Sequence, residues 1–369
     1  MKTRKIYAIM GILAIFSIIL SVTTCDNGTT SPSAHVHQWG EWAVTTAPTC
    51  TTEGEETRVC TIDTTHKETR SIAALGHDWG NWTPTTAPTY TTEGVETRAC
   101  THDATHIETR AISRIPFTSV AGFGTWLTSQ PNNTAETAYT VMLNINDEDD
   151  LSALKTALNN ASDKFIYLDL SGSTITEIPS YTFNTGDPLY TGCYTLTGIT
   201  IPNSVESIGN AAFADCTNLI SVTIPNSVKS IGIVAFGDCT NLTSISIPNS
   251  VESIGIGAFT GCTSLTSITI GNSITSISGM AFYYCTSLTS ITIPNSVTSI
   301  LHGAFSGCTN LTSVTFEGTI PSTEFYDGIN PPFLGDLRDK FYATDPTNGT
   351  PGTYTTTAPV GASSVWVKQ

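Results

Sequence analysis

The chain has 369 residues, enough for one large domain or two smaller ones. Only 12% of the residues are charged, and the formal net charge of −16 disfavours binding to nucleic acid or to an anionic membrane surface, because both need clustered Lys and Arg. A chain so poor in charge has to bury its apolar groups through a regular pattern, so internal repeats are the first feature to examine.

Residues 1–24 have the pattern of an export signal. The first residues are basic, and the apolar run over residues 6–20 is short for a membrane span. The segment Val22-Thr23-Thr24-Cys25 follows, and it resembles a bacterial lipoprotein signal in the relaxed form tolerated in spirochaetes. The resemblance implies that Cys25 is lipidated and that residues 25–36 form a polar tether. A plain secretory signal is the alternative, and it also predicts export.

Residues 37–113 contain a motif that recurs after 40 residues. His37-Gln38-Trp39-Gly40 returns as His77-Asp78-Trp79-Gly80, and Thr-rich runs with Pro and Gly return at the same interval. Such runs indicate short strands joined by turns. Each copy has two Trp and little else that is apolar, so the sequence predicts two small β-rich stalk modules. They resemble the short tandem modules in stalks of bacterial surface proteins.

Cysteine and histidine side chains in the first module raise the question of a metal site. These residues are His37, Cys50, Cys60 and His66. In the second module Tyr90 stands where the first has Cys50, and neither module has the close Cys-x-x-Cys pair of structural zinc sites. The sequence therefore predicts that no metal binds here.

A disulfide between Cys50 and Cys60, across a hairpin, is favoured over a metal site because the cell envelope is oxidising. This pairing leaves Cys100 without a partner. His102 and His106 are then expected to be polar side chains that face the solvent.

A longer repeat begins at the first of six cysteines that are spaced 23 residues apart: Cys193, Cys216, Cys239, Cys262, Cys285 and Cys308. In a representative coil, the segment from Leu242 to Ile247 alternates as a strand does, and Pro248 ends it because Pro has no N–H to donate. One coil cannot bury its own apolar face, but stacked coils form a continuous core. Residues 167–320 are therefore predicted to form a repeat solenoid of the α/β type. It has short parallel strands and short helical or 3-10 turns, such as one at 254–259.

This repeat resembles the leucine-rich repeat of the BspA-like, or Treponema, type. The pattern L-x-x-I-x-I-P followed by I-G-x-x-A-F-x-x-C stands five times over residues 194–308. Gly271 replaces the Pro in one coil, and Leu301 replaces the Gly in another. The resemblance implies a surface protein that attaches to host extracellular-matrix proteins or to other bacterial surface proteins, with no cofactor.

Both ends of the solenoid need caps. Residues 114–166 are predicted to be a linker and an N-terminal cap helix, because an acidic run is followed by Leu151, Leu154 and Leu158. Residues 321–369 hold the aromatic side chains that a C-terminal cap needs, and Phe325 is expected to be partly exposed there. The repeated cysteines are expected to be buried thiols, because disulfides between neighbours would distort a regular ladder.

The sequence predicts a protein without enzymatic activity. Six of the seven histidines lie at 35–106 and only His302 lies in the repeats, so the repeats barely supply the base that a Ser-His-Asp triad needs. Together, the export signal and the repeats predict a lipid-anchored adhesin or protein-interaction scaffold at the outer surface of the cell envelope. A structural spacer protein without a specific ligand is the alternative.

Two faces of the solenoid are candidates for partner contact. The strand face is predicted to expose small hydroxyls from Ser221, Thr223, Ser244, Ser246, Ser267, Thr269, Ser290 and Thr292. The second candidate lies where the coils vary most, and we call it the tyrosine side: Met280, Tyr283, Tyr284 and His302. Neighbouring exposed tyrosines supply large, rigid contact area, so we expect partners to bind the tyrosine side. The alternative is that one tyrosine only covers the adjacent coil.

Overall fold

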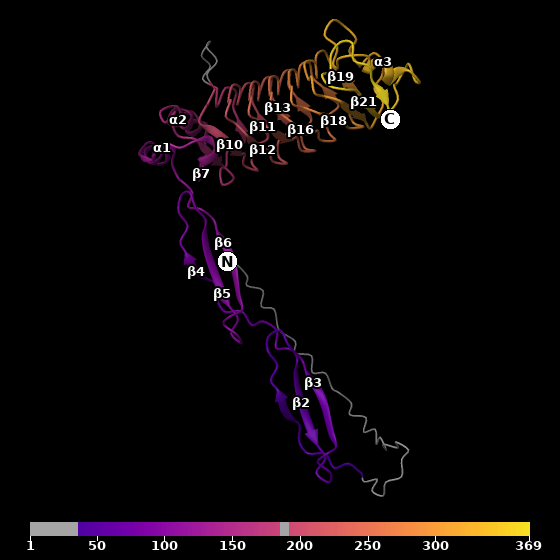
Figure 1. Cartoon of the computed structure of the whole chain (residues 1–369). Coiled ribbons are helices and arrows are strands. Elements are labelled where there is room, and N and C mark those ends of the chain that lie inside the picture. Colours follow the sequence, from indigo (N-terminus) through magenta and orange to yellow (C-terminus); the bar gives the residue numbers. More distant parts are fainter. Residues whose placement is uncertain (1–35, 185–191) are drawn as a thin grey trace, which may run out of the picture. The chain divides into compact units, whose positions relative to one another are not determined.

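The computed structural model describes residues 36–184 and 192–369 (Figure 1). The chain divides into two compact units, one of residues up to Trp82 with Arg98–Glu108, the other of Thr83–Thr97 with Thr109–Gln369. The predicted signal at 1–24, Cys25 and almost all of the tether lie outside the described residues. None of the helices in the described part is both long and apolar enough to cross a membrane.

Each stalk module is a three-stranded sheet. The first sheet has the order β1 (Ala43–Thr46), β2 (Gly54–Val59), β3 (Lys67–Ile72), and the second β4 (Thr83–Thr86), β5 (Gly94–Ala99), β6 (Ile107–Ile112). A single small sheet cannot enclose a core, and most of the strand residues are exposed or half-buried. Arginine side chains cover the tryptophans instead: the Arg58 guanidinium lies 4.7 Å from the Trp42 ring centre.

Two helices and a strand precede the first repeat coils. The predicted cap helix is α2 (Glu148–Asn159), and the side chain of Asp147 caps it by accepting a hydrogen bond from the Asp150 N–H at 2.9 Å. The segment before it, expected to be a linker, contains a further helix, α1 (Val120–Ser129), and the strand β7 (Tyr139–Met142). Val120, Phe123 and Leu127 bury one face of α1.

Parallel strands form the predicted solenoid, in two columns. One column contains β8 (Ile166–Asp169), β10 (Leu196–Thr200), β12 (Ser221–Thr223), β14 (Ser244–Ser246), β16 (Ser267–Thr269), β18 (Ser290–Ile293) and β20 (Ser313–Phe316). The other contains β9 (Glu177–Ile178), β11 (Ser207–Ile208), β13 (Ser230–Ile231), β15 (Ser253–Ile254), β17 (Ser276–Ile277) and β19 (Ser299–Ile300). The repeat period sets the register, so that Ile245 pairs with Ile268 in the next coil. The structure thus confirms the repeat solenoid.

The short helical turn predicted at 254–259 is not formed. Ile254 belongs to strand β15, and the residues after it form turns in which alternate N–H groups donate to the next coil, while Ala258 and Thr260 donate three residues back. For example, the Phe259 N–H donates to the Ala281 carbonyl at 2.8 Å. Between Ile254 and Phe259, Gly257 adopts the left-handed backbone conformation, with a φ of 63°. A helix would need these N–H groups to bond four residues back, so stacking replaces helix formation.

A ladder of phenylalanines fills the core beneath these turns. Consecutive rings are stacked with centroids 4.7 to 5.4 Å apart: Phe183, Phe213, Phe236, Phe259, Phe282, Phe305 and Phe333. The repeated cysteines are buried free thiols beside it. Cys262 shows the pattern: its thiol donates to the Phe236 carbonyl one coil back at 3.2 Å, and burial raises its pKa well above the usual value. The thiols from Cys216 to Cys308 link neighbouring coils in this way.

The C-terminal segment covers the last coil with β21 (Gly352–Thr355), β22 (Val367–Lys368) and α3 (Leu337–Tyr342). Strand β21 pairs antiparallel with β20 and ends the parallel stack. The expected partial exposure of Phe325 is wrong, because its side chain is 1% exposed. Aromatic rings from three parts of the cap surround it, among them Phe333 at 6.0 Å and Phe341 at 5.9 Å between centroids.

Candidate interaction surface and a cysteine–histidine cluster

Stacking of the coils brings the four residues of the tyrosine side together. Met280, Tyr283 and Tyr284 lie in the turns after β17, and His302 lies in the corresponding turn of the next coil. The Met280 N–H donates to the His302 carbonyl at 2.9 Å. The imidazole of His302 lies over the backbone of Gly279, where a Cβ atom would come within 2.4 Å of the ring. These side chains therefore form one continuous surface.

The two tyrosines contact each other and the next coil. Their rings meet edge to face with centroids 4.4 Å apart. Burial, followed by the hydrogen bond with Tyr284, raises the pKa of Tyr283. The Tyr284 ring covers Gly307, since a Cβ there would lie 3.0 Å from the ring, yet Tyr284 remains 51% exposed. The ring of Tyr284 thus covers the adjacent coil on one side and faces solvent on the other.

Tyr284 occupies a backbone position that favours glycine. Its φ is 58°, and the same position in neighbouring coils holds Gly261 at 68° and Gly307 at 80°. The left-handed conformation costs a residue with a Cβ roughly 1–2 kcal/mol. Asp238 at 55° and Asp215 at 59° occupy this position in two earlier coils, so side chains are tolerated there, but a large half-exposed aromatic ring occurs only at Tyr284 among these five coils.

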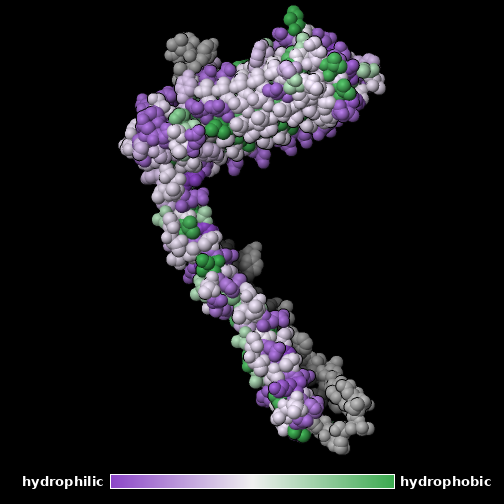
Figure 2. Space-filling view, viewed as in Figure 1, coloured by the Kyte–Doolittle hydropathy of each residue, from purple (hydrophilic) through white to green (hydrophobic). Residues whose placement is uncertain are grey.

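Exposed apolar side chains that are not among the predicted contact residues extend the same face. Ile233 and Ile256 occupy corresponding turns of adjacent coils, and each is 48% exposed. Leu301, beside His302, is 38% exposed. A signal for them exists in the sequence, because these apolar residues fall outside the periodic core columns. In the space-filling view, the solenoid face that is shown carries separate hydrophobic patches on a mostly pale surface (Figure 2).

All eight predicted hydroxyl positions of the strand face are exposed. They alternate with inward residues, as in β14, where Ser244 and Ser246 are exposed and Ile245 is buried. The hydroxyl face is therefore regular from coil to coil and offers the same small groups to any partner along its length.

Two carboxyl groups in the turns before the cysteines make stability depend on pH. Burial raises the pKa of Asp238, and burial together with the charge of Asp238 raises the pKa of Asp215. A raised pKa means that the ionised carboxylate destabilises the folded state. This destabilisation decreases as the pH falls through the raised pKa and is gone below the unfolded-state pKa of about 3.9. Asp238→Asn should therefore raise the melting temperature at pH 7, and this gain should vanish below about pH 3.9.

Asp345 provides the control of opposite sign. Backbone N–H groups of Asn348 and Thr347 hold its pKa below the usual value, so its charge stabilises the fold. Asp345→Asn should lower the melting temperature at pH 7 and have no effect at low pH. A gain for Asp238→Asn that persists unchanged at pH 3 would show that the charge of Asp238 is not its cause.

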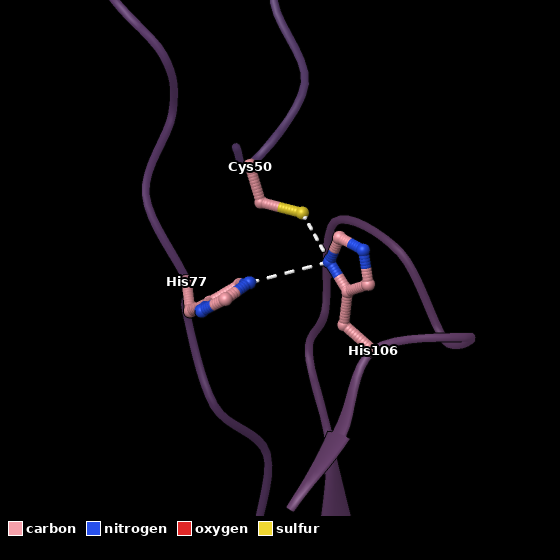
Figure 3. A group of neighbouring side chains, drawn as sticks. All are labelled: Cys50, His77 and His106. Atoms are coloured by element: carbon pink, nitrogen blue, oxygen red, sulfur yellow. Dashed lines mark hydrogen bonds between the residues drawn. The ribbon is translucent and has the colours of Figure 1, made fainter. Parts of the chain in front are cut away.

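In the stalk, the structure places Cys50 in a different environment from the predicted one. No disulfide joins Cys50 and Cys60 in the structure, in contrast to the prediction. Cys50 instead contacts the second repeat copy: its Sγ lies 2.8 Å from His106 Nδ1, and His77 Nε2 lies 3.2 Å from the same nitrogen (Figure 3). His106, expected to face solvent, is half-buried in this cluster, whereas His102 is exposed.

The side chain of Cys100 interacts with Cys50 beside this cysteine–histidine cluster. Burial raises the pKa of Cys50, and the Cys100 side chain raises it further through charge and hydrogen bonding. Burial also acts on Cys100, but backbone hydrogen bonds from His102, Asp103 and Asp78 outweigh it and hold the pKa of Cys100 below its usual value. Cys100 forms no disulfide, as expected, but its side chain interacts with that of Cys50.

The repeats match a known family. Residues 183–312 fit the model of the BspA-type leucine-rich repeat region in six copies. The chain belongs to the BspA-type leucine-rich-repeat proteins.

Solved structures of bacterial leucine-rich-repeat proteins are similar to this BspA-type chain. A Treponema pallidum leucine-rich-repeat protein is 31% identical over 42% of this chain and 71% of its own, with a TM-score of 0.38. One from Bacteroides ovatus is 29% identical over 44% of this chain and 39% of its own, with a TM-score of 0.36. A leucine-rich cell surface protein from Faecalibacterium prausnitzii is 19% identical over 73% of this chain and 88% of its own, with a TM-score of 0.22. The curated proteins include no match.

Proposed function

We propose that this BspA-type protein is an exported, lipid-anchored protein of the outer cell surface that binds other proteins through its repeats. One observation carries the proposal: Tyr284 is held half-exposed in a left-handed conformation, beside Tyr283, where neighbouring coils have glycine. Retaining it against the preference of the backbone favours a role in contact with a partner. Partners of the kind that BspA-like proteins attach to, host extracellular-matrix proteins and bacterial surface proteins, fit such a surface.

The repeat cysteines support a role without catalysis. Their thiols are at most 2% exposed, and burial raises the pKa of those in the middle of the stack. A buried thiol with a raised pKa is a poor nucleophile. The histidine of the repeats, His302, packs against the Tyr326 ring at 5.8 Å rather than beside these thiols. These buried thiols are therefore suited to stabilising the coils rather than to reacting with a substrate.

A matched pair of double variants tests which face binds. Tyr283→Ser with Tyr284→Gly reproduces residues found in other coils and relieves the backbone conformation at 284, so the fold should be kept. We expect this variant to lose binding to immobilised fibronectin or fibrinogen about tenfold or more, as the loss of a hot spot does. Ser244→Glu with Ser267→Glu places charge on the strand face and should leave binding nearly unchanged.

Circular dichroism and thermal melting show whether both variants remain folded. If the charged strand-face variant loses binding and the tyrosine variant keeps it, the assignment of the two faces is reversed. A wild-type protein that binds neither matrix proteins nor bacterial cells would favour the alternative function, a structural spacer with no specific ligand.

A further inference from the structure

Each stalk module contributes the same three metal-ligating side chains. In the second module these are His77, Cys100 and His106; in the first, His37, Cys60 and His66 occupy the same repeat positions. The backbone pairing is also repeated, because Trp39 bridges to Cys60 as Trp79 bridges to Cys100. The two histidine rings of each module lie close together, with centroids 4.7 Å apart in the first and 5.1 Å in the second. Both modules thus repeat the same two neighbouring histidines and a cysteine at the same bridge.

A cysteine from the preceding module completes this group at the second module. The ligand atoms of Cys50, His77 and His106 all lie within 4.8 Å of one another, and the side chain of Cys100 interacts with that of Cys50. The donors of a tetrahedral zinc ion, bound at 2.0–2.3 Å, lie about 3.3–3.8 Å apart. The 3.2 Å between His77 Nε2 and His106 Nδ1 is close to this spacing.

We propose that Cys50, His77 and His106 bind a structural zinc ion that joins the first stalk module to the second, and that the Cys100 thiol becomes the fourth ligand when the ion binds. Two thiolates and two imidazoles are a ligand set of structural zinc sites, and the mixture of sulfur and nitrogen donors selects zinc over calcium or magnesium. A disulfide between the two cysteines would not account for the close approach of His77 to His106 beside the Cys50 thiol.

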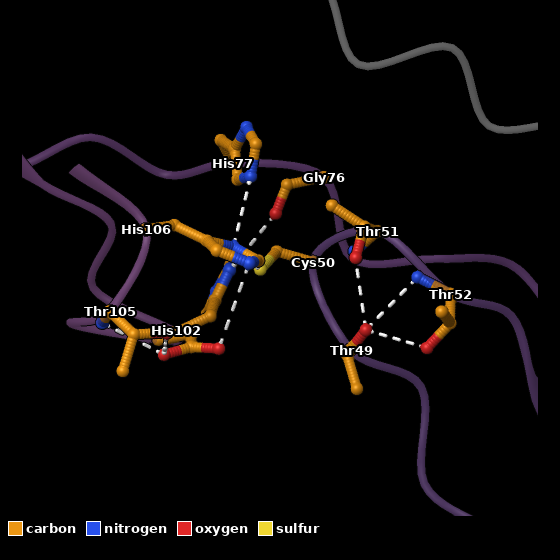
Figure 4. Close-up of polar contacts among 10 residues, drawn as sticks. Thr49, Cys50, Thr51, Thr52, Gly76, His77, His102, Thr105 and His106 are labelled. Carbon is orange, nitrogen blue, oxygen red and sulfur yellow. Dashed lines mark hydrogen bonds and ion pairs between the residues drawn. The ribbon is translucent and has the colours of Figure 1, made fainter. Parts of the chain in front are cut away.

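Residues around the cluster hold its ligands as they are held in metal sites. His106 directs Nδ1 to Cys50 and the opposite nitrogen, Nε2, toward the Asp103 carboxylate, 3.9 Å away. Thr105 fixes this carboxylate through its hydroxyl at 2.7 Å and its N–H at 2.9 Å (Figure 4). A carboxylate behind a ligating histidine sets its orientation and raises its basicity.

The metal site is not repeated after the second module, because Tyr90 stands there at the position that Cys50 has in the first module. Tyr90 is the corresponding residue of the second module, and its ring stacks on Phe117 with centroids 4.1 Å apart. A cysteine ligand is thus present where a module is followed by another histidine-bearing module, and an aromatic residue is present where the cap region follows. This pattern is what a metal joint between modules requires.

Metal analysis of the intact chain, purified under reducing conditions, tests the proposal. We expect one zinc ion per chain by inductively coupled plasma mass spectrometry. His106→Ala should reduce this to near zero, while the matched variant His66→Ala in the first module should keep it. Cobalt(II) bound in place of zinc should show a thiolate-to-metal charge-transfer band that Cys50→Ser weakens and that Cys50→Ser with Cys100→Ser removes. Asp103→Asn should keep the stoichiometry but weaken zinc affinity about 10–100-fold.

Three results would overturn the proposal. The first is a chain that binds no zinc with its thiols reduced. The second is equal loss of zinc in His106→Ala and His66→Ala. The third is a Cys50–Cys100 disulfide, found by peptide mapping of protein purified without reductant even when zinc is supplied during expression. None of these results depends on whether the solenoid binds a partner.

Discussion

Phe259→Ala is expected to lower the free energy of unfolding by about 3–5 kcal/mol, because it removes a large buried side chain and leaves a cavity. Phe259 is fully buried, and its ring stacks between Phe236 at 5.3 Å and Phe282 at 5.4 Å. A regular stack has little freedom to collapse into the cavity, since every coil is held on both sides by its neighbours. Denaturant unfolding followed by circular dichroism measures the loss.

Phe325→Ala in the C-terminal cap is expected to cost about as much as Phe259→Ala. The two side chains are about equally buried, with 1% of Phe325 and 0% of Phe259 exposed. The rings of Phe333 and Phe341 enclose Phe325. A much smaller effect at Phe325 would show that the cap opens independently of the stack. A small effect at Phe259 would contradict the stacking register itself.

Cys25→Ser is expected to move nearly all of the protein from the membrane fraction to the soluble fraction. The lipoprotein-like signal predicts cleavage before Cys25 and acylation of its thiol and amine, and two or more acyl chains give stable membrane attachment. None of the helices in the described residues could replace the lipid as a membrane span. Fractionation of cells that express each form measures the effect.

Cys60→Ser serves as the control for the loss of a thiol, and it should remain in the membrane fraction. Mass spectrometry of the mature N-terminus gives an independent test. An unmodified Cys25, or cleavage at another residue, would show that the lipoprotein prediction is wrong even if export occurs.

The sequence by itself determined the solenoid, because a coil that recurs every 23 residues must place each residue beside its own copy. This argument predicted the apolar columns, the parallel strands and the register of Ile245 with Ile268. The cap helix α2 followed from local signals alone, an acidic cap and three leucines at helical spacing. The tyrosine side was also predictable, since residues at corresponding positions of adjacent coils are neighbours.

Only the tertiary structure decided the features that the 23-residue spacing of the repeat does not predict. The spacing after Ile254 predicts a helical turn, but alternate N–H groups there bond to the next coil. The left-handed φ of Tyr284 follows from the path of the stack rather than from the preference of tyrosine. Cys50 and His106 are 56 residues apart and belong to different copies of the motif, so their contact could not be found within one module. Periodicity predicts which copies face each other, but the packing of one module on the next determines which side chains meet.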